Sequence, residues 1–291
     1  MSILRLTYFL NGFLMIAMPI GLAIYLTRKF KQGWRLFWIG AATFVFSQLL
    51  HIPFNALVSP VFNQFGFIAL PVVLQDVSLS LFFGLSAGLF EELSRYAMYR
   101  WWAKDARSWG MGLLAGVGHG GSEAIILGLL VLYGYVQMLI VRGMDISTLV
   151  TTDKIELAKT QIQAYWSAPW YMTMLGALER LFTIPLHLAC AVLVLQAFTR
   201  RKFGWVGLAV LLHALADGMV VFVAKIGFSV LAIEGIIGAF AIVSVAIVFA
   251  LRQPEPLGAV EEPDLVPTPM LEFTPRPPEE TGENLEKTRF Q

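Results

Sequence analysis

Seven long apolar segments limit what this chain can fold into more than any other feature of its sequence. A helix needs about 20 residues to cross the hydrocarbon layer of a bilayer, and its backbone polar groups must be satisfied within the segment. The sequence therefore predicts an all-α, polytopic transmembrane helix bundle of about seven spans (seven to eight). The spans are expected near residues 6–27, 34–56, 66–101, 110–141, 170–198, 204–224 and 227–251.

The composition agrees with a membrane protein and excludes some other classes. The chain is 57% hydrophobic and only 14% charged, whereas a soluble domain carries roughly 25% charged residues. The net charge of +1 and the lack of a basic domain give no reason to expect a nucleic-acid partner. The single cysteine, Cys190, excludes an intrachain disulfide and a zinc site built from cysteines. We therefore expect an integral, multi-pass protein of a cell membrane, with the lipid bilayer as its surroundings.

The distribution of basic residues between the spans predicts the orientation of the chain. The loops after the first, third and fifth spans are rich in lysine and arginine, whereas the loop at 57–65 carries no charge. Because basic loops stay in the cytoplasm, we expect the N-terminus outside and the C-terminus inside. The basic residues of the three loops are Arg28, Lys29, Lys31, Arg35, Arg100, Lys104, Arg107, Arg200, Arg201 and Lys202.

Two regions outside the spans differ from the rest. The loop at 142–169 mixes acidic and basic residues and is expected outside, where 153–165 can form a short surface helix. Residues 252–291 are rich in proline and glutamate, a composition that cannot bury a core. The sequence therefore predicts a transmembrane domain at 1–251 and a disordered cytoplasmic tail at 252–291.

Three motifs place ionisable residues inside the spans, where each charge costs several kcal/mol unless it is paired or hydrated. They are Glu91-Glu92-x-x-Arg95 in the third span, His119-Gly-Gly-Ser-Glu123 in the fourth and His213-x-x-x-Asp217 in the sixth. Residues three or four positions apart share a helix face. Each motif therefore predicts a charged or hydrogen-bonded pair on its own helix.

The depths of these motifs agree with one another. At about 1.5 Å per residue, Glu91 and Glu92, His119, His187 and His213 lie roughly 14 to 19 Å from the basic-loop ends of their spans. Unrelated polar residues would be scattered along the spans. The common depth predicts one site inside the bilayer, in the half expected to be cytoplasmic.

Such a set of residues can carry out hydrolysis. A glutamate can take a proton from water as a general base, and neutral imidazoles can bind a metal or hydrogen-bond the water. If the site uses a metal, zinc with three protein ligands and one water is the usual arrangement, and His119, His187 and His213 are the candidate ligands. Arg95 can hold one glutamate ionised, and the Gly120-Gly121 pair would let a peptide approach the helix.

Each of these residues also has a structural interpretation. Arg95 could snorkel to the membrane interface and pair with Glu91 or Glu92, and the two glycines could serve helix packing. His187 follows Pro185 closely, so it could bond a backbone carbonyl that the proline leaves free. His51 is expected to be structural, and Glu179-Arg180 to be an ion pair or gate near the outer interface.

The three motifs together resemble the YhfC-type family of intramembrane proteases, which is related to the CAAX-prenyl-protease, bacteriocin-processing and PrsW-type group. The resemblance covers roughly residues 70–225. It implies about eight packed helices, a site reached from the cytoplasmic side, and Glu91 or Glu92 as the base that activates water. It also implies that His119 and His213 hold this water or a metal, and that Asp217 stabilises the oxyanion or orients the histidine.

The chain departs from the CAAX branch at two positions. Only Leu93 and Ser94 separate the glutamates from Arg95, where that branch has three residues, and Ala115 stands where that branch has phenylalanine. Glu123 and His187 fit the YhfC-type pattern but not the CAAX branch. The resemblance therefore does not imply prenylated substrates.

Three functions remain open at this stage. The leading hypothesis is an intramembrane endopeptidase that cleaves a membrane-bound protein or peptide with glutamate-activated water, with or without Zn²⁺. The alternative is a proton or metal-ion transporter or channel that uses the same glutamates and histidines and has a path on both sides of them. The third is a non-catalytic chaperone or immunity-type binding protein.

Overall fold

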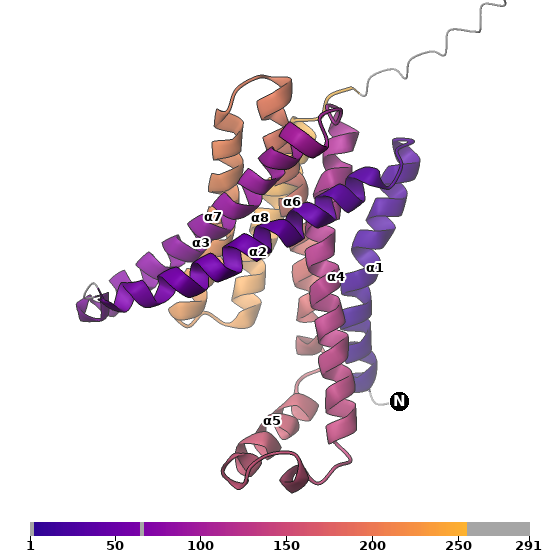
Figure 1. Cartoon of the computed structure of the whole chain (residues 1–291). Coiled ribbons are helices and arrows are strands. Elements are labelled where there is room, and N and C mark those ends of the chain that lie inside the picture. Colours follow the sequence, from indigo (N-terminus) through magenta and orange to yellow (C-terminus); the bar gives the residue numbers. More distant parts are fainter. Residues whose placement is uncertain (1–2, 65–66, 255–291) are drawn as a thin grey trace, which may run out of the picture. The chain divides into compact units, whose positions relative to one another are not determined.

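In this computed structural model, the structure describes residues 3–64 and 67–254, and all regular structure in these residues is helical. Within these ranges seven helices are long and apolar enough to cross a membrane, which confirms the predicted all-α, polytopic bundle (Figure 1). The α-helices of the described residues are α1 (Ile3–Lys29), α2 (Arg35–Gln64), α3 (Val72–Ala97), α4 (Trp109–Val141), α5 (Ile155–Ser167), α6 (Leu175–Thr199), α7 (Gly204–Lys225) and α8 (Val230–Ala250).

Shorter helical turns join these helices. The third span continues from α3 into a π-helical turn at Met98–Trp102, and α6 is preceded by a 3₁₀ turn at Met172–Met174. Further 3₁₀ turns lie at Phe67–Ala69, Ile146–Thr148 and Thr152–Lys154. The short helix expected at 153–165 is α5. The expected disordered tail lies outside the described residues except for 252–254, and the side of the membrane on which each loop lies stays a prediction.

The turn between α7 and α8 is as short as the sequence predicts. Gly227 adopts a φ of 87°, in the left-handed region that glycine reaches without a steric penalty. Ser229 then caps α8, because its side chain accepts a hydrogen bond from the Ala232 backbone N–H at 3.3 Å.

Two helix crossings built on small residues set the geometry of the bundle. Where α3 meets α7, a Cβ atom on Gly84 would collide with the Ala214 carbonyl oxygen, and one on Gly88 would press on the Val210 carbonyl. Where α2 meets α4, a Cβ atom on Gly118 would collide with the backbone of Phe37. Small residues allow membrane helices to approach this closely.

These crossings lie directly beside the ionisable motifs. Gly88 is one helical turn before Glu91 on α3, and the residue that faces it on α7, Ala214, follows His213. Gly118 on α4 precedes His119. The close approach of the backbones therefore brings the acidic motif of α3 towards the histidines of α4 and α7.

The main hydrophobic core fills one end of the bundle. It is built from the segments that adjoin the basic loops, so we name this the basic-loop end. At its surface Arg35 and Asp105 form an ion pair, and the hydrogen bond from Arg35 lowers the pKa of Asp105. The large buried side chains of the core include Leu26, Leu36, Phe37, Met98, Tyr99, Trp109, Leu113, Leu114, Val117, Val192, Leu195, Val206 and Val248.

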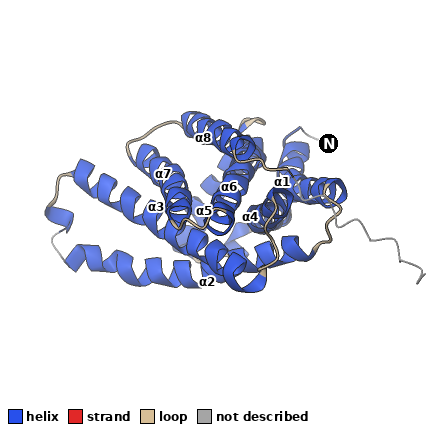
Figure 2. Cartoon of the chain, turned by 90° about the horizontal axis from the view of Figure 1, so that it is seen from above, coloured by secondary structure: helices blue, strands red, loops and turns tan. Residues whose placement is uncertain are grey.

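The other end carries α5 and the turn between α7 and α8, and we name it the α5 end. Figure 1 shows α2 and α3 side by side and inclined to α4, so that they diverge from it towards the α5 end. In the view from above, α3 runs beside α7, while α6 and α8 lie together on the other side (Figure 2). The helices are therefore packed closely at the basic-loop end and spread apart towards the α5 end.

Candidate active site

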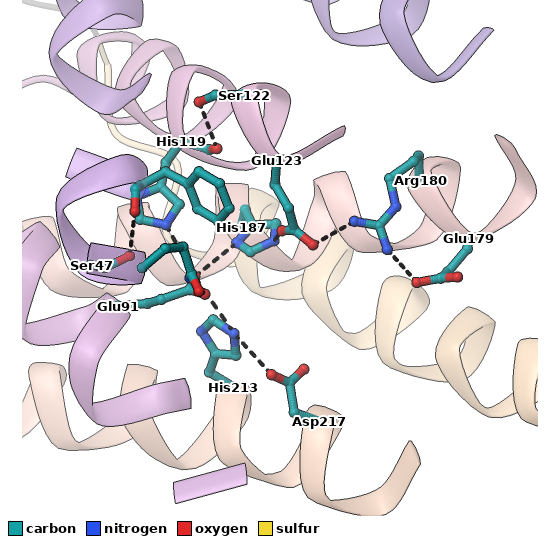
Figure 3. A network of polar contacts seen from close by, with 12 residues as sticks. Ser47, Glu91, His119, Ser122, Glu123, Glu179, Arg180, His187, His213 and Asp217 are labelled. Atoms are coloured by element: carbon teal, nitrogen blue, oxygen red, sulfur yellow. Dashed lines mark hydrogen bonds and ion pairs between the residues drawn. The ribbon is translucent and has the colours of Figure 1, made fainter. Parts of the chain in front are cut away.

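Glu91 lies at the centre of the ionisable residues, and three histidines from three helices surround it (Figure 3). Its side chain is nearly buried, and its Oε1 atom accepts a hydrogen bond from Gln48 of α2 at 3.0 Å. The distances from its Oε2 atom are 3.0 Å to His119 Nε2, 3.8 Å to His187 Nδ1 and 3.8 Å to His213 Nε2. The predicted common depth of these four residues therefore corresponds to one cluster.

Glu92 is completely buried and faces other partners. It forms an ion pair with Arg95, and its Oε1 atom lies 2.7 Å from His213 Nδ1. Because an ionised carboxylate only accepts hydrogen bonds, His213 Nδ1 carries the proton of this bond. Arg95 has an exposed fraction of 1%, so the interpretation that it snorkels to the interface is wrong.

The position of His187 is fixed through both ring nitrogens. Its Nδ1 atom accepts from Arg95 at 2.7 Å, so its Nε2 atom carries the proton and donates to Glu123 at 2.8 Å. The side chain therefore contacts the cluster rather than a carbonyl that Pro185 leaves free. Arg180 donates to the other oxygen of Glu123 at 2.5 Å and also pairs with Glu179.

Only one of the two predicted His-x-x-x-acid pairs forms among the described residues. His213 Nε2 and Asp217 Oδ2 are 3.5 Å apart on α7. The pair expected between His119 and Glu123 is replaced by contacts across helices, since His119 contacts Glu91 and Glu123 contacts His187 and Arg180. The spacing along α4 predicted that His119 and Glu123 share a face. Their hydrogen-bond and ion-pair partners, however, come from the neighbouring helices α3 and α6.

The Gly120-Gly121 pair faces protein side chains. A Cβ atom on Gly120 would overlap the ring of His187, and one on Gly121 would press on Pro19 of α1. The expectation that these glycines make room for a peptide is therefore wrong, and the packing interpretation holds. Gly120 gives His187 the space to reach Glu123.

Several polar residues of the site were not foreseen from the sequence. Gln48 bonds Glu91, and Cys190 lies beside Glu92 and His213. Both follow a periodicity that could have identified them, because Gln48 is three residues before His51 and Cys190 three residues after His187. His51 itself bonds Asn55 at 2.7 Å and Ser86 at 3.0 Å, outside the ion pairs of the cluster.

Two groups of side chains in the described part of the chain could hold a metal ion. Glu91, His119 and His187 offer ligand atoms that all lie within 4.8 Å of one another, and so do Glu92, Cys190 and His213. Two imidazoles and a carboxylate are a ligand set that catalytic zinc accepts, so the first group fits such an ion. By these distances His213 falls in the second group and not with His119 and His187, and Cys190 is a possible ligand despite being the only cysteine.

Two cavities meet at this cluster. One, of about 370 Å³, lies between α3, α6, α7 and α8 and is named the α6–α8 cavity. The other, of about 630 Å³, lies between α2 and α4 and is named the α2–α4 cavity. Neither is lined by Glu92, Arg95 or His119, and the residues that line both are His51, Ala87, Glu91, Glu123 and Asp217.

Both cavities extend from Glu91 towards the α5 end. The α6–α8 cavity reaches Glu179 and Val221, and the α2–α4 cavity reaches Pro53 and Leu127. On the other side of Glu91, the hydrophobic core fills the bundle up to the basic loops. The open space beside Glu91 therefore lies towards the α5 end, and access from the cytoplasmic side stays a prediction.

In the described part of the chain, seven apolar helices and a buried cluster of glutamates and histidines define a multi-pass integral membrane protein. The family model "YhfC intramembrane metalloprotease" matches residues 14–247, and the chain belongs to this family. It is 33% identical over 213 residues to the "Uncharacterized membrane protein YhfC" of Bacillus subtilis (strain 168), a match that covers 71% of this chain and 80% of that protein. No solved structure gives a significant match.

Proposed function

We propose that the chain is an intramembrane endopeptidase that hydrolyses a peptide bond of a membrane-associated substrate. One observation carries this proposal: the carboxylate on which three imidazoles converge, Glu91, is also the carboxylate at which two cavities meet. Hydrolysis needs a proton acceptor beside space for both water and peptide. Glu91 meets both needs.

Glu91 rather than Glu92 is the proposed general base. Glu91 lines both cavities, so a water molecule and a substrate can reach its carboxylate. Glu92 has no exposed surface and is held between Arg95 and His213. Its role is to keep Arg95 paired and to orient the His213 ring, as carboxylates behind active-site histidines do.

His213 is the proposed proton donor. Its Nδ1–H is bound to Glu92, and its Nε2 atom faces both Glu91 and Asp217. A proton on Nε2 would lie between these two carboxylates, which can accept a hydrogen bond from it. This N–H group can stabilise the oxygen of a tetrahedral intermediate or protonate the leaving amine.

The family is one of metalloproteases, and the first ligand group fits this description. In a metal-bound site Glu91, His119 and His187 would hold the ion, with His187 oriented by Glu123, and Glu91 would then act as a ligand instead of as the base. The chemistry that bound zinc supplies is a lower pKa of its water molecule and polarisation of a carbonyl oxygen. Binding of the ion by His187 Nδ1 would replace the hydrogen bond that this atom accepts from Arg95, and Arg95 would still balance the charge of the two adjacent glutamates.

The transporter alternative receives less support. A transported ion needs a path on both sides of its binding site, and a single-sided cavity that ends at a hydrophobic core offers access for a substrate rather than passage. Flux of protons or zinc through liposomes that contain the protein distinguishes the two functions. We expect cleavage without flux.

The test of the proposal is cleavage of single-span reporter proteins in liposomes, with fragments identified by mass spectrometry. We expect Glu91→Gln to lower the rate by about 10²- to 10⁴-fold, the range that general-base catalysis provides, without changing thermal unfolding. Glu92→Gln is expected to lower the unfolding temperature as well, because Arg95 loses the closer of its two buried carboxylate partners. Glu156→Gln, on the exposed face of α5, is the matched control. Full activity of the Glu91→Gln variant would refute the assignment of the base.

A further inference from the structure

The fourth histidine, His51, has no part in the proposed reaction, yet it lies where the α6–α8 cavity and the α2–α4 cavity meet. The residues that line both cavities are His51, Ala87, Glu91, Glu123 and Asp217. Three of these five are carboxylates, which only accept hydrogen bonds when they are ionised. His51 is therefore the one member of this shared wall whose side chain can donate a hydrogen bond.

The His51 ring is held beside the proposed general base. Gln48, one helical turn before His51 on α2, donates to Glu91 Oε1 at 3.0 Å. The ring of His51 stacks on the ring of Phe90, which precedes Glu91 on α3, with 5.6 Å between the ring centroids. Contacts on both sides of the chain position of Glu91 thus fix His51 next to it.

One nitrogen of the His51 ring is bonded and the other is free. His51 Nε2 lies 2.7 Å from Asn55 Nδ2 and 3.0 Å from Ser86 Oγ. The amide nitrogen of asparagine only donates, so Nε2 accepts and the proton of the neutral ring is on Nδ1. His51 Nδ1 makes no hydrogen bond in the described part of the chain, and protein atoms do not fully enclose it. The structure therefore leaves one oriented N–H group available at the shared wall.

The proposed reaction needs such a donor at this place. When water adds to a peptide carbonyl, the carbonyl oxygen becomes negative, and a preformed donor stabilises it most in the transition state. The three carboxylates of the shared wall would repel this oxygen. His213 lines only the α6–α8 cavity, and the amide of Gln48 is already bonded to Glu91.

We propose that His51 Nδ1–H donates to the carbonyl oxygen of the scissile bond and stabilises the oxyanion of the tetrahedral intermediate. This inference rests on the proposed function, because Glu91 has to activate the water. Asn55 and Ser86 are positioning residues, since they hold Nε2 and so set the direction of Nδ1–H.

The assignment completes the sequence of bond changes. Water gives a proton to Glu91 while its oxygen bonds the carbonyl carbon, and the π electron pair of the carbonyl moves to the oxygen that His51 holds. When this pair returns, the C–N bond breaks and the leaving nitrogen takes a proton from His213. The proton on Glu91 then restores His213, whose Nε2 atom lies 3.8 Å from Glu91 Oε2.

Two substitutions of His51 separate a catalytic role from a structural one. The amide of glutamine reaches about as far as Nε2 of histidine, so His51→Gln can keep the bonds to Asn55 and Ser86 but lacks the donor at Nδ1. The shorter amide of asparagine reaches the place of Nδ1, so His51→Asn keeps a donor there and loses those bonds. The full chain in liposomes is assayed with a neutral single-span peptide whose cleavage site has been mapped, and thermal unfolding is measured in parallel.

We expect His51→Gln to lower kcat by about 10²- to 10³-fold, the loss that follows removal of one oxyanion donor. KM and the unfolding temperature should change little, because the lost bond forms in the transition state. His51→Asn is expected to keep a higher kcat than His51→Gln at a lower unfolding temperature. A structural role of His51 predicts the opposite order.

Ser86→Ala tests the positioning of the ring. It removes one partner of Nε2, so kcat is expected to fall by a smaller factor than in His51→Gln. Ser78→Ala is the matched control on α3, because its hydroxyl group bonds only the Leu74 carbonyl, at 2.7 Å, and lines neither cavity. This control should leave kcat unchanged.

Full activity of His51→Gln, or a higher KM at unchanged kcat in this variant, would overturn the inference. Activity that follows the unfolding temperature through all the variants would overturn it as well. If Glu91→Gln is inactive while His51→Gln is fully active, the inference fails and the proposed function stands. If Glu91→Gln stays active and His51→Gln does not, the assignment of the base fails and the His51 donor stands. If the wild type cleaves no peptide, both fail.

Discussion

At the scale of single residues, two of the three histidines around Glu91 are held by a carboxylate on their other ring nitrogen. Glu123 accepts from His187 Nε2 at 2.8 Å, and Glu92 accepts from His213 Nδ1 at 2.7 Å. Such partners fix the tautomer and the direction of the ring. As a result, His187 Nδ1 and His213 Nε2 both point to the Glu91 oxygen.

This arrangement makes Glu123 a positioning residue whose effect can be measured through metal binding. We expect Glu123→Gln to weaken zinc binding by about 10- to 100-fold, the range found for partners of ligating histidines. Zinc affinity is measured by competition with a chelator, with thermal unfolding as the check of folding and Glu156→Gln as control. An unchanged affinity in a folded Glu123→Gln protein would show that this carboxylate does not position His187.

The sequence predicted those site residues whose signal lies within one helix. Glu91, Glu92, His119 and His213 stand out because charged and histidine residues are rare in apolar spans. The ion pair of Glu179 with Arg180 was predicted and forms. The contacts of Gln48 with Glu91 and of Arg180 with Glu123 were not predicted, since each depends on which faces of separate helices meet. The partner of Glu123 was predicted wrongly for the same reason. The spacing of residues along α4 does not indicate which residues of α6 face them.

At the scale of helices, length and apolar composition predicted seven spans because each span has to cross the same thickness of lipid. The tilt of α2 and α3 and the pairing of α3 with α7 were not predicted, since helix association in lipid depends on local van der Waals packing. The glycines that allow these crossings are visible in the sequence. Their partners on the facing helix become visible only in the structure.

The crossing of α3 and α7 gives a prediction at this scale. Gly84→Val is expected to lower the free energy of unfolding by about 1–3 kcal/mol, because the new side chain collides with the Ala214 carbonyl. It should also reduce activity, since Glu91 and His213 lie just beyond this contact. Gly207→Ala is the control, because nothing lies within 4 Å of a Cβ atom there. Stability is measured by thermal unfolding. If the two variants were equally stable, α3 and α7 would not approach as closely at Gly84 as the structure shows.

At the scale of the whole helical unit, the two halves of the bundle differ in how closely they are packed. The basic-loop half holds the main core and fixes the positions of Glu92 and Arg95, while the half towards the α5 end leaves space around Glu91. Composition could not reveal this division, because both halves of every span are apolar. The position of a cavity depends on how the helices pack, and this packing was not predicted from the sequence.

The division predicts the side from which a water-soluble reagent reaches the site. Cys190 is buried, so single cysteines can be introduced and labelled in membrane vesicles with a membrane-impermeant thiol reagent. Lys202→Cys marks the basic-loop side and Asp145→Cys marks the α5 side, since both residues are exposed. We expect Thr183→Cys, which lines the α6–α8 cavity, to react from the same side as Asp145→Cys.

Val192→Cys provides the matched control on the same helix. It lies in the filled half of the bundle with no exposed surface, so it should react from neither side. Saturating the α6–α8 cavity with a substrate peptide should slow the labelling of Thr183→Cys but not of Asp145→Cys. Labelling of Thr183→Cys from the Lys202 side would mean that the site opens through the basic loops, and the proposed path of the substrate from the α5 end would have to be abandoned.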